Sequence, residues 1–310
     1  RRYLSETGGT EGGGYAQAYY NLAYLAFNAG RYTEADSLFS RFLQAEPSPE
    51  LRADALCRIG DCRYHARGFD AALAAYREAA GADETKRPYA LYREAYIAGI
   101  RKAYDEKIAL LDSLLRHYPQ DETAADALYE LGRAYVLTGA GDRALGAYEL
   151  LMQRYPHSDQ ARRAAAERSM LLAQAGRTEE AVAAYKELAE TYPGTPEARQ
   201  SLQELKTWAV ENRQIEQYLQ YSDTLQGGRY AVAAEEREAL LAEELAAREK
   251  EAEERRLAQA DSLYGAGALE ELRLMGADSL HESGAKAHYL YCQMLHDRGE
   301  NARAEEETTA

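Results

Sequence analysis

Three Tyr-Pro dipeptides divide the middle of the chain into segments of equal length. Tyr118-Pro119, Tyr155-Pro156 and Tyr192-Pro193 follow one another at intervals of 37 residues. A sequence period of about 20–50 residues is typical of small structural units stacked in a row. This period constrains the fold more than any other feature, because one unit of this size cannot bury its apolar face without neighbours.

The residues between the dipeptides predict two antiparallel helices in each unit. Residues 123–137 place apolar side chains at the spacing of one helical face, and Gly139 ends that helix in a left-handed turn. Residues 142–154 form the second helix, which Pro156 ends because proline blocks helix continuation. Gly132 is expected to lie where the paired helices cross closely, since only a small residue fits there. Each unit is therefore a helical hairpin.

Six such units can be aligned, from one that begins near Ala16 to an irregular sixth that begins near Arg199. Their shared order of small residue, Gly turn, second small residue, aromatic residue and Pro resembles the tetratricopeptide repeat. The resemblance implies an all-α fold, an α-α superhelix of about six to seven helical hairpins. It also implies that the first helices of the hairpins line a concave groove.

Two units depart from the pattern. In the second unit the turn glycine is displaced by one residue, to Gly68. In the third unit Lys102 replaces the turn glycine, and Lys107 stands where a small alanine is usual. We expect the helix contact in the third unit to be looser, with the Lys107 stem buried and its ammonium group reaching water.

Four segments are predicted along the chain: a Gly-rich flexible leader over 1–14, the solenoid over 15–225, a long charged helix over 226–262, and a degenerate repeat over 263–310. Tyr230 to Asp261 contains no Gly or Pro and has Glu–Arg pairs four residues apart. Its leucines do not maintain a heptad, which favours a solvated helix or strut over a coiled coil. Because no polar helix caps the array, we expect the last repeat to be truncated and the chain to be a piece of a longer protein.

Composition excludes several classes of function. The formal net charge of −15 argues against binding to nucleic acid and to anionic membrane surfaces, which require basic patches. No apolar run approaches the roughly 20 residues needed to span a bilayer. The three cysteines form no CxxC motif, and no two histidines lie three or four residues apart. With no motif for hydrolysis or phosphate binding, the chain is predicted to be neither an enzyme nor a metal or cofactor binder.

Tyrosine dominates the aromatic residues, with 25 Tyr against 4 Phe and 1 Trp. Tyr supplies rigid, amphipathic contact area and is enriched at binding hot spots. By the repeat register, eleven residues are predicted to line the groove and contact a partner: Tyr20, Tyr24, Phe27, Asp61, Tyr64, His65, Tyr89, Tyr92, Tyr96, Tyr129 and Arg133. The alternative is that these tyrosines pack between adjacent hairpins and expose only their hydroxyl groups. The Lys and Asn residues of a carboxylate clamp are missing, which disfavours a chaperone-tail ligand.

The boundary phrase Tyr155 to Ala161 resembles repeats of bacterial envelope proteins, namely outer-membrane assembly lipoproteins and periplasmic division coordinators. Residues 125–136 are similar to large tetratricopeptide proteins of Bacteroidota. These resemblances imply a non-catalytic scaffold in a periplasmic or outer-membrane complex of the cell envelope; a cytoplasmic location is the alternative. Two other functions stay open, a glycan- or peptidoglycan-binding module and the regulatory arm of a longer enzyme. Neither the protein partner nor the oligomeric state follows from the sequence.

Overall fold

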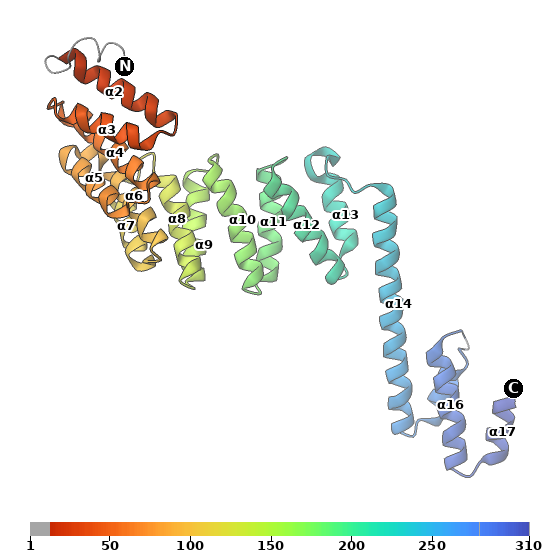
Figure 1. Ribbon diagram of the computed structural model, residues 1–310. Helices are drawn as coiled ribbons and strands as arrows, with labels where there is room; N and C mark the ends of the chain where they lie inside the picture. The colour runs from red at the N-terminus through yellow and green to blue at the C-terminus, as the bar shows by residue number, and fades with distance from the viewer. Residues whose placement is uncertain (1–12, 279, 310) are drawn as a thin grey trace. The chain divides into compact units, whose positions relative to one another are not determined.

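A computed structural model describes residues 13–278 and 280–309 of the chain. Within these ranges the chain forms sixteen α-helices and two short 3-10 helices, and no β-strand (Figure 1). The predicted all-α fold is confirmed. The expected leader over 1–14 lies outside the described residues, except for Gly13 and Gly14. Contacts divide the chain into two compact units, residues 1–201 and 202–310, and each is treated separately below.

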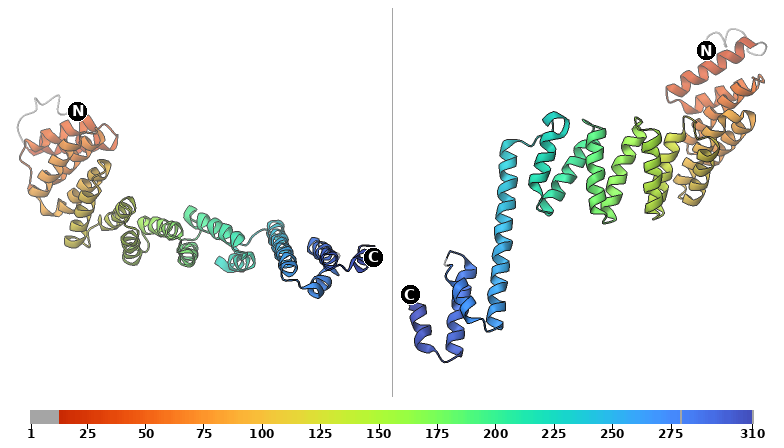
Figure 2. Two further views of the ribbon diagram at one scale, coloured as in Figure 1. Left: turned by 90° about the horizontal axis from the view of Figure 1, so that it is seen from below. Right: turned by 180° about the vertical axis from the view of Figure 1, so that it is seen from behind.

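Five helical hairpins make up the first unit, and each helix contacts the next one along the chain (Figures 1 and 2). Their helices are α2 (Gly13–Asn28) and α3 (Tyr32–Leu43), α4 (Pro49–His65) and α5 (Phe69–Ala82), α6 (Arg87–Ile100) and α7 (Tyr104–His117), α8 (Ala124–Leu137) and α9 (Gly141–Arg154), and α10 (Asp159–Gln174) and α11 (Thr178–Thr191). A 3-10 turn, η1 (Glu84–Lys86), precedes α6, and α12 (Pro196–Glu211) follows α11.

The turn inside each hairpin depends on one residue with a left-handed backbone. Gly30, Gly139 and Gly176 adopt it with φ between 70° and 74°. In the second hairpin, however, Arg67 takes this conformation with φ 60°, while Gly68 has φ −83°. The displaced glycine therefore does not replace the turn residue, and the prediction for Gly68 is wrong. Lys102 likewise turns the third hairpin with φ 60°, because the repeat geometry outweighs the cost of a side chain there.

Glycines on two first helices accept the ring of a tyrosine from the second helix. A Cβ atom on Gly132 would lie 2.7 Å from Cδ1 of Tyr148, and a Cβ on Gly60 would lie 2.7 Å from Cδ1 of Tyr76. Both tyrosines are completely buried. The close packing predicted at Gly132 is confirmed, and in both hairpins the large ring occupies the volume that the glycine leaves free.

The Tyr-Pro dipeptides connect neighbouring hairpins. The Tyr155 hydroxyl donates to the carbonyl oxygen of Pro119 at 3.0 Å, and the Tyr192 hydroxyl donates to that of Pro156 at 2.9 Å. Proline has no N–H and ends the helix before it, while its carbonyl remains free to accept. The same hydrogen bond therefore recurs from one repeat to the next, between the tyrosine of one Tyr-Pro dipeptide and the proline of the dipeptide before it.

In the second unit, a single long helix carries two small clusters of apolar residues. Its elements are α13 (Ile215–Thr224), η2 (Leu225–Gly228), α14 (Ala234–Gly265), α15 (Leu269–Gly276), α16 (Glu282–Asp297) and α17 (Asn301–Thr309). The first part of α14 packs on α13 through Leu240, Ile215 and Leu219. Its last part packs on α15 and α16 around Ala260, Leu272 and Leu295.

Candidate functional site

All eleven residues predicted to line a groove lie on the first helices α2, α4, α6 and α8. Their environments nevertheless differ. Some of the side chains engage neighbouring hairpins through hydrogen bonds, and others are exposed. The geometry around a single buried carboxylate on α4 explains most of this difference.

Asp61 is the centre of a network that joins α4, α5 and α6. It is only 3% exposed and accepts hydrogen bonds from the hydroxyls of Tyr76 at 2.8 Å and Tyr89 at 2.7 Å. Arg58 forms an ion pair with it at 2.6 Å, and Arg93 forms another at 3.1 Å. A buried carboxylate is tolerated only when its charge is compensated and its oxygens are hydrogen-bonded. These four donors meet that requirement and hold two arginines between three helices.

Burial and the Asp61 charge raise the pKa of both tyrosines that donate to this carboxylate. For Tyr76 and Tyr89 burial is the larger cause and the neighbouring negative charge is the second. Both hydroxyls therefore remain protonated at neutral pH and remain donors.

The two arginines lie over aromatic rings. The Arg93 guanidinium is 4.5 Å from the ring centre of Tyr64, and the Arg58 guanidinium is 5.3 Å from that of Tyr89 and 5.8 Å from that of Phe27. At these distances a cation is attracted by the ring face. Asp61 thus fixes two cations, and these in turn order the half-buried rings predicted to face a partner.

Tyr96 is an exposed aromatic residue that contacts both Tyr64 and Tyr92. Its side chain is 38% exposed. Its ring centre lies 5.9 Å from the ring centre of Tyr64 and 6.5 Å from that of Tyr92. Burial, followed by the nearby charges of Asp126 and Glu130, raises the pKa of Tyr92. Tyr64, Tyr92 and Tyr96 therefore form a contiguous patch on α4 and α6, in which Tyr96 is the most accessible ring.

Two other junctions between hairpins repeat the pairing of tyrosines with a carboxylate. Tyr20 and Tyr24 both donate to Asp54 on α4, the former at 2.7 Å. Tyr129 on α8 and Tyr148 on α9 donate to the two oxygens of Glu167 on α10, at 2.6 Å and 2.5 Å. Burial and the hydrogen bond to Glu167 raise the pKa of Tyr129 to about 12. These hydroxyl groups are therefore engaged within the chain.

His65 lies at the edge of the aromatic patch on α4 and α6, with its ring centre 5.6 Å from that of Tyr64. It is exposed near the end of α4, and its ring stacks on Tyr32 with 4.0 Å between the ring centres and 4° between the planes. Tyr32 begins α3, so this contact joins the turn ends of the first two hairpins. Contact of His65 with a partner remains a prediction.

A cavity of about 200 Å³ opens between α6, α7 and α8. Ile100 and Leu137 at its edge are exposed, and Arg133 is half exposed. The lining residues combine apolar and charged side chains: Tyr96, Gly99, Ile100, Tyr104, Lys107, Glu130, Arg133 and Leu137. Only Tyr96 and Arg133 among them were predicted from the repeat register.

Lys107 forms part of the charged lining of this cavity and does not extend to water as predicted. It is 6% exposed, and its Nζ forms an ion pair with Glu130 on α8. Gly99 makes room for it, since a Cβ there would lie 3.1 Å from Cδ of the lysine. A buried ammonium group needs a partner, and a buried glutamate on the next hairpin supplies one. The expectation of a snorkelling side chain is wrong because Glu130 supplies a buried counter-charge, so the ammonium group does not need to reach water.

The sequence contained signals for some of the residues that register alone missed. Arg58 precedes Asp61 by three residues and Arg93 follows Tyr89 by four, so each shares a helix face with a predicted residue. Lys107 was conspicuous as a lysine at a small-residue position. Asp54 and Glu167 gave no such signal, because their tyrosine partners lie 19 to 38 residues away in the chain.

Metal-ligand groups and reactive thiols are two further kinds of site to consider among the described residues. Within residues 13–278 and 280–309 there is no group of three or more His, Cys, Asp or Glu side chains that could hold a metal ion. The three cysteines are buried thiols, and burial raises the pKa of each, which suppresses the reactive thiolate. Over the same described residues, no helix is long and apolar enough to cross a membrane.

The fold and surface thus define a class: an array of α-helical hairpins whose first helices present aromatic and arginine side chains. Tetratricopeptide-repeat family models match residues 16–49, 126–158 and 168–195. These three segments therefore match the tetratricopeptide repeat, as the sequence pattern predicts. The comparison with curated proteins finds no match.

Several solved structures are similar to this chain. One is the C-terminal part of a TPR repeat-containing protein from Cytophaga hutchinsonii, at 16% identity and a TM-score of 0.55, covering 68% of this chain and 84% of that one. MamA matches at 21% identity and a TM-score of 0.47, covering 57% and 91% of the two chains. YrrB, described as a TPR protein with an unusual peptide-binding site, matches at 18% identity and a TM-score of 0.44, covering 62% and 93%. The first of these likenesses supports the repeat fold.

Proposed function

We propose that this chain is a non-catalytic scaffold that binds a segment of another protein along α4, α6 and α8. The observation that carries the proposal is the cavity beside Tyr96, with its exposed apolar edge at Ile100 and Leu137 and with Arg133 next to it. Aromatic and arginine side chains beside an exposed apolar edge are the usual composition of a binding hot spot.

The size of the cavity favours a protein side chain as the ligand. About 200 Å³ is below the roughly 300–1,000 Å³ typical of sites for cofactors and drug-sized molecules. One large apolar side chain of a partner would contact Ile100, Tyr104 and Leu137. The guanidinium of Arg133 would then donate to a carbonyl or carboxylate oxygen of the same segment.

The aromatic patch would extend the contact from the cavity towards α4. Arg93, whose position depends on the buried Asp61 network, lies over the ring of Tyr64, and Tyr64 in turn contacts Tyr96. A surface ordered before binding loses less conformational entropy on association than a mobile one does. In this proposal Asp61 positions the surface, and Tyr64, Tyr96 and Arg133 contact the partner.

Site-specific photo-crosslinking in the native cell tests this function. A photoreactive amino acid at Ile100 should capture a protein, and the crosslinked peptide should be identified by mass spectrometry. Ala109, exposed on α7 and outside the cavity lining, is the matched control position. Leu137→Asp in the same chain should reduce capture at Ile100 and leave the fold intact, because Leu137 is exposed.

Identical proteins captured from both positions, with no effect of Leu137→Asp, would refute the proposed surface.

Stacking of sugar rings on tyrosine would instead make the chain a glycan-binding module. Co-sedimentation with purified peptidoglycan that is lost in Tyr96→Ala would favour that function over protein binding.

We further propose the bacterial cell envelope as the setting of this scaffold. The support is the resemblance of Tyr155 to Ala161 to repeats of envelope proteins. Fractionation of the source cells, with immunodetection of the native chain, tests it directly. Recovery in the cytoplasmic fraction alone would remove this part of the proposal and leave the binding surface unaffected.

A further inference from the structure

The second unit breaks the regular spacing of hairpin turns. Left-handed turn residues occur at Gly139, Gly176 and Arg213, 37 residues apart. The next turn at this interval would fall at Lys250, but α14 continues through that position without interruption. The chain therefore omits a turn, and with it the second helix that would have returned along the first part of α14.

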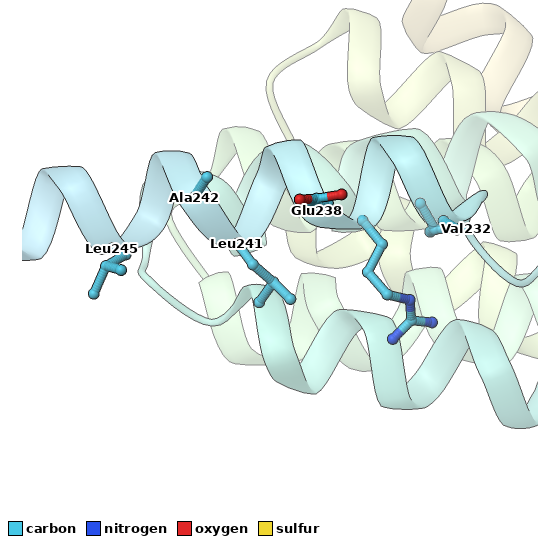
Figure 3. A pocket seen from close by; sticks show the side chains of 7 residues that line it. Val232, Glu238, Leu241, Ala242 and Leu245 are labelled. Atoms are coloured by element: carbon cyan, nitrogen blue, oxygen red, sulfur yellow. The ribbon is translucent and has the colours of Figure 1, made fainter.

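One side of α14 is uncovered as a result. α15 has only eight residues against the 32 of α14, and its Leu272 packs with Ala260 near the end of the long helix. Farther back, Leu241 is 36% exposed and Leu245 is 59% exposed. They line a hollow of about 520 Å³ together with Val232, and Figure 3 shows both leucines projecting from the same side of α14.

This side is distinct from the one that packs on α13. Leu240 and Glu244 are buried on the α13 side. Arg237 lies at the border between the two sides, because it lines the hollow and also forms an ion pair with Asp223 at 2.5 Å. Leu241 and Leu245 each follow one of those buried residues and therefore point about 100° away from them. The two exposed leucines therefore do not belong to the core of the second unit.

The exposed side has a pattern that is complementary to itself. Ala234, Glu238, Leu241, Leu245, Arg248 and Ala252 follow one another at spacings of four and three residues, which places them on one helical seam. The seam is symmetric about residue 243. If two such helices lie antiparallel, Leu241 faces Leu245 of the second copy, Glu238 faces its Arg248, and Ala234 faces its Ala252.

The charged side chains on the seam are accessible to a second copy. Glu238 forms no ion pair in the part of the chain that the structure describes. Arg248 pairs with Glu244 of its own helix and donates to the carbonyl oxygen of Arg213 at 3.2 Å, but its side chain is 54% exposed and can also reach a carboxylate of a second copy. A parallel pair in register would instead place Glu238 against Glu238, which is unfavourable.

We propose that α14 pairs antiparallel with α14 of a second copy of this chain and so forms a symmetric dimer. The seam from Ala234 to Ala252 is about 27 Å long at 1.5 Å per residue, with two leucine pairs at its centre. Such a contact is smaller than that of most permanent dimers, so the monomer and dimer exchange. The leucines do not continue as a heptad, so the pairing is confined to this short seam.

Sedimentation velocity over a concentration series of the full chain tests the pairing. The unmodified chain should show a concentration-dependent rise to the mass of two copies. Glu238→Arg should weaken the dimer by about tenfold or more, because it places a second positive charge against Arg248 of the other copy. Glu243→Arg makes the same charge change on the opposite side of α14 and should leave the equilibrium unchanged.

Mixing two single variants tests the antiparallel geometry. Arg248→Glu alone should also weaken the dimer, because it places two carboxylates against each other at each end of the seam. A mixture of Glu238→Arg with Arg248→Glu should associate, because each end of the heterodimer then pairs an arginine of one chain with a glutamate of the other. Leu245→Glu, at an exposed position, should abolish association in any mixture. Circular dichroism melts of each variant establish that the chain remains folded.

A chain that stays monomeric up to about 0.5 mM, well above the dissociation constants typical of weak interfaces, would overturn the proposal. So would a dimer that Leu245→Glu leaves intact. An association that Glu238→Arg and Glu243→Arg weaken equally would place the contact elsewhere on the chain.

Discussion

The ring of Tyr148 occupies the volume in which a side chain on Gly132 would have to lie. A Cβ atom on this glycine would approach Cδ1 to 2.7 Å and Cζ to 2.8 Å. Tyr148 is completely buried, and its hydroxyl is tied to Glu167, so the ring cannot move aside without breaking that hydrogen bond. We expect Gly132→Ala to lower the free energy of unfolding by about 1–3 kcal/mol, through overpacking.

Gly146 provides a matched control in the same hairpin. It lies within α9, and a Cβ there would meet nothing within 4 Å. Alanine costs less backbone entropy than glycine in a helix, so Gly146→Ala should raise the free energy of unfolding by about 0.5–1 kcal/mol. Urea unfolding of both variants measures the pair. Equal effects of the two substitutions would contradict the packing assigned to Gly132.

The hairpin fold could be predicted because the information for it is local. The spacing of Gly132, Gly139 and Pro156 predicts a close crossing, a turn and a stop, and each of these needs no knowledge of distant residues. The prediction for Gly68 is wrong because this glycine lies beside the turn, at φ −83°, and is not the turn residue. The backbone of the array sets the turn position, and Arg67 follows it at some cost.

That cost leads to a second prediction, for the turn residues. Arg67 has φ 60° and Lys102 has φ 60°, and this conformation costs an L-residue with a side chain roughly 1 kcal/mol relative to glycine. Arg67→Gly and Lys102→Gly should therefore each stabilise the chain by about 0.5–1 kcal/mol, measured as a higher urea midpoint with an unchanged slope. Gly68→Ala, at φ −83°, should change stability by much less than Gly139→Ala, at φ 74°.

The candidate site was less predictable, because it depends on contacts between hairpins. The register places Tyr89 and Asp61 on first helices, but it does not show that the hydroxyl of Tyr89 donates its hydrogen bond to the Asp61 carboxylate. Nor did it indicate that Lys107 would meet Glu130, 23 residues later in the chain. Periodicity identifies the face on which a residue lies, and the identity of its neighbour on the next hairpin decides whether it is free.

The buried pair of Lys107 and Glu130 gives a third prediction. Lys107→Met would leave the Glu130 carboxylate buried beside the cavity with Arg133 as its remaining ion-pair partner, 3.4 Å away. We expect a loss of about 3 kcal/mol, in line with the removal of one member of a buried ion pair. Adding Glu130→Gln should recover part of this loss, because the double variant no longer buries an uncompensated charge.

A double-mutant cycle in urea measures that recovery. The coupling between the two positions should be at least about 1 kcal/mol. Strict additivity would mean that the two side chains do not interact in solution.

The last prediction concerns alkaline pH and Tyr129. Burial and the hydrogen bond to Glu167 raise its pKa from 10.0 to about 12, so the folded chain holds this proton more tightly than the unfolded chain does. Below pH 10 both states are protonated, and the stabilisation is complete. As the pH rises from 10 to 12 the unfolded state ionises first, and the stabilisation is lost through the folded pKa.

Tyr129→Phe should therefore cost about 1 kcal/mol at pH 8, by loss of the hydrogen bond, and should make the decline in stability between pH 10 and 12 shallower. Tyr104→Phe is the control, because the Tyr104 hydroxyl makes no hydrogen bond to a carboxylate among the described residues. Urea unfolding at several pH values, followed by far-UV circular dichroism, provides the comparison. Because Glu167 belongs to the next hairpin, a shallower decline in Tyr129→Phe alone would mean that contacts between repeats, and not the hairpins themselves, set the alkaline limit of the array.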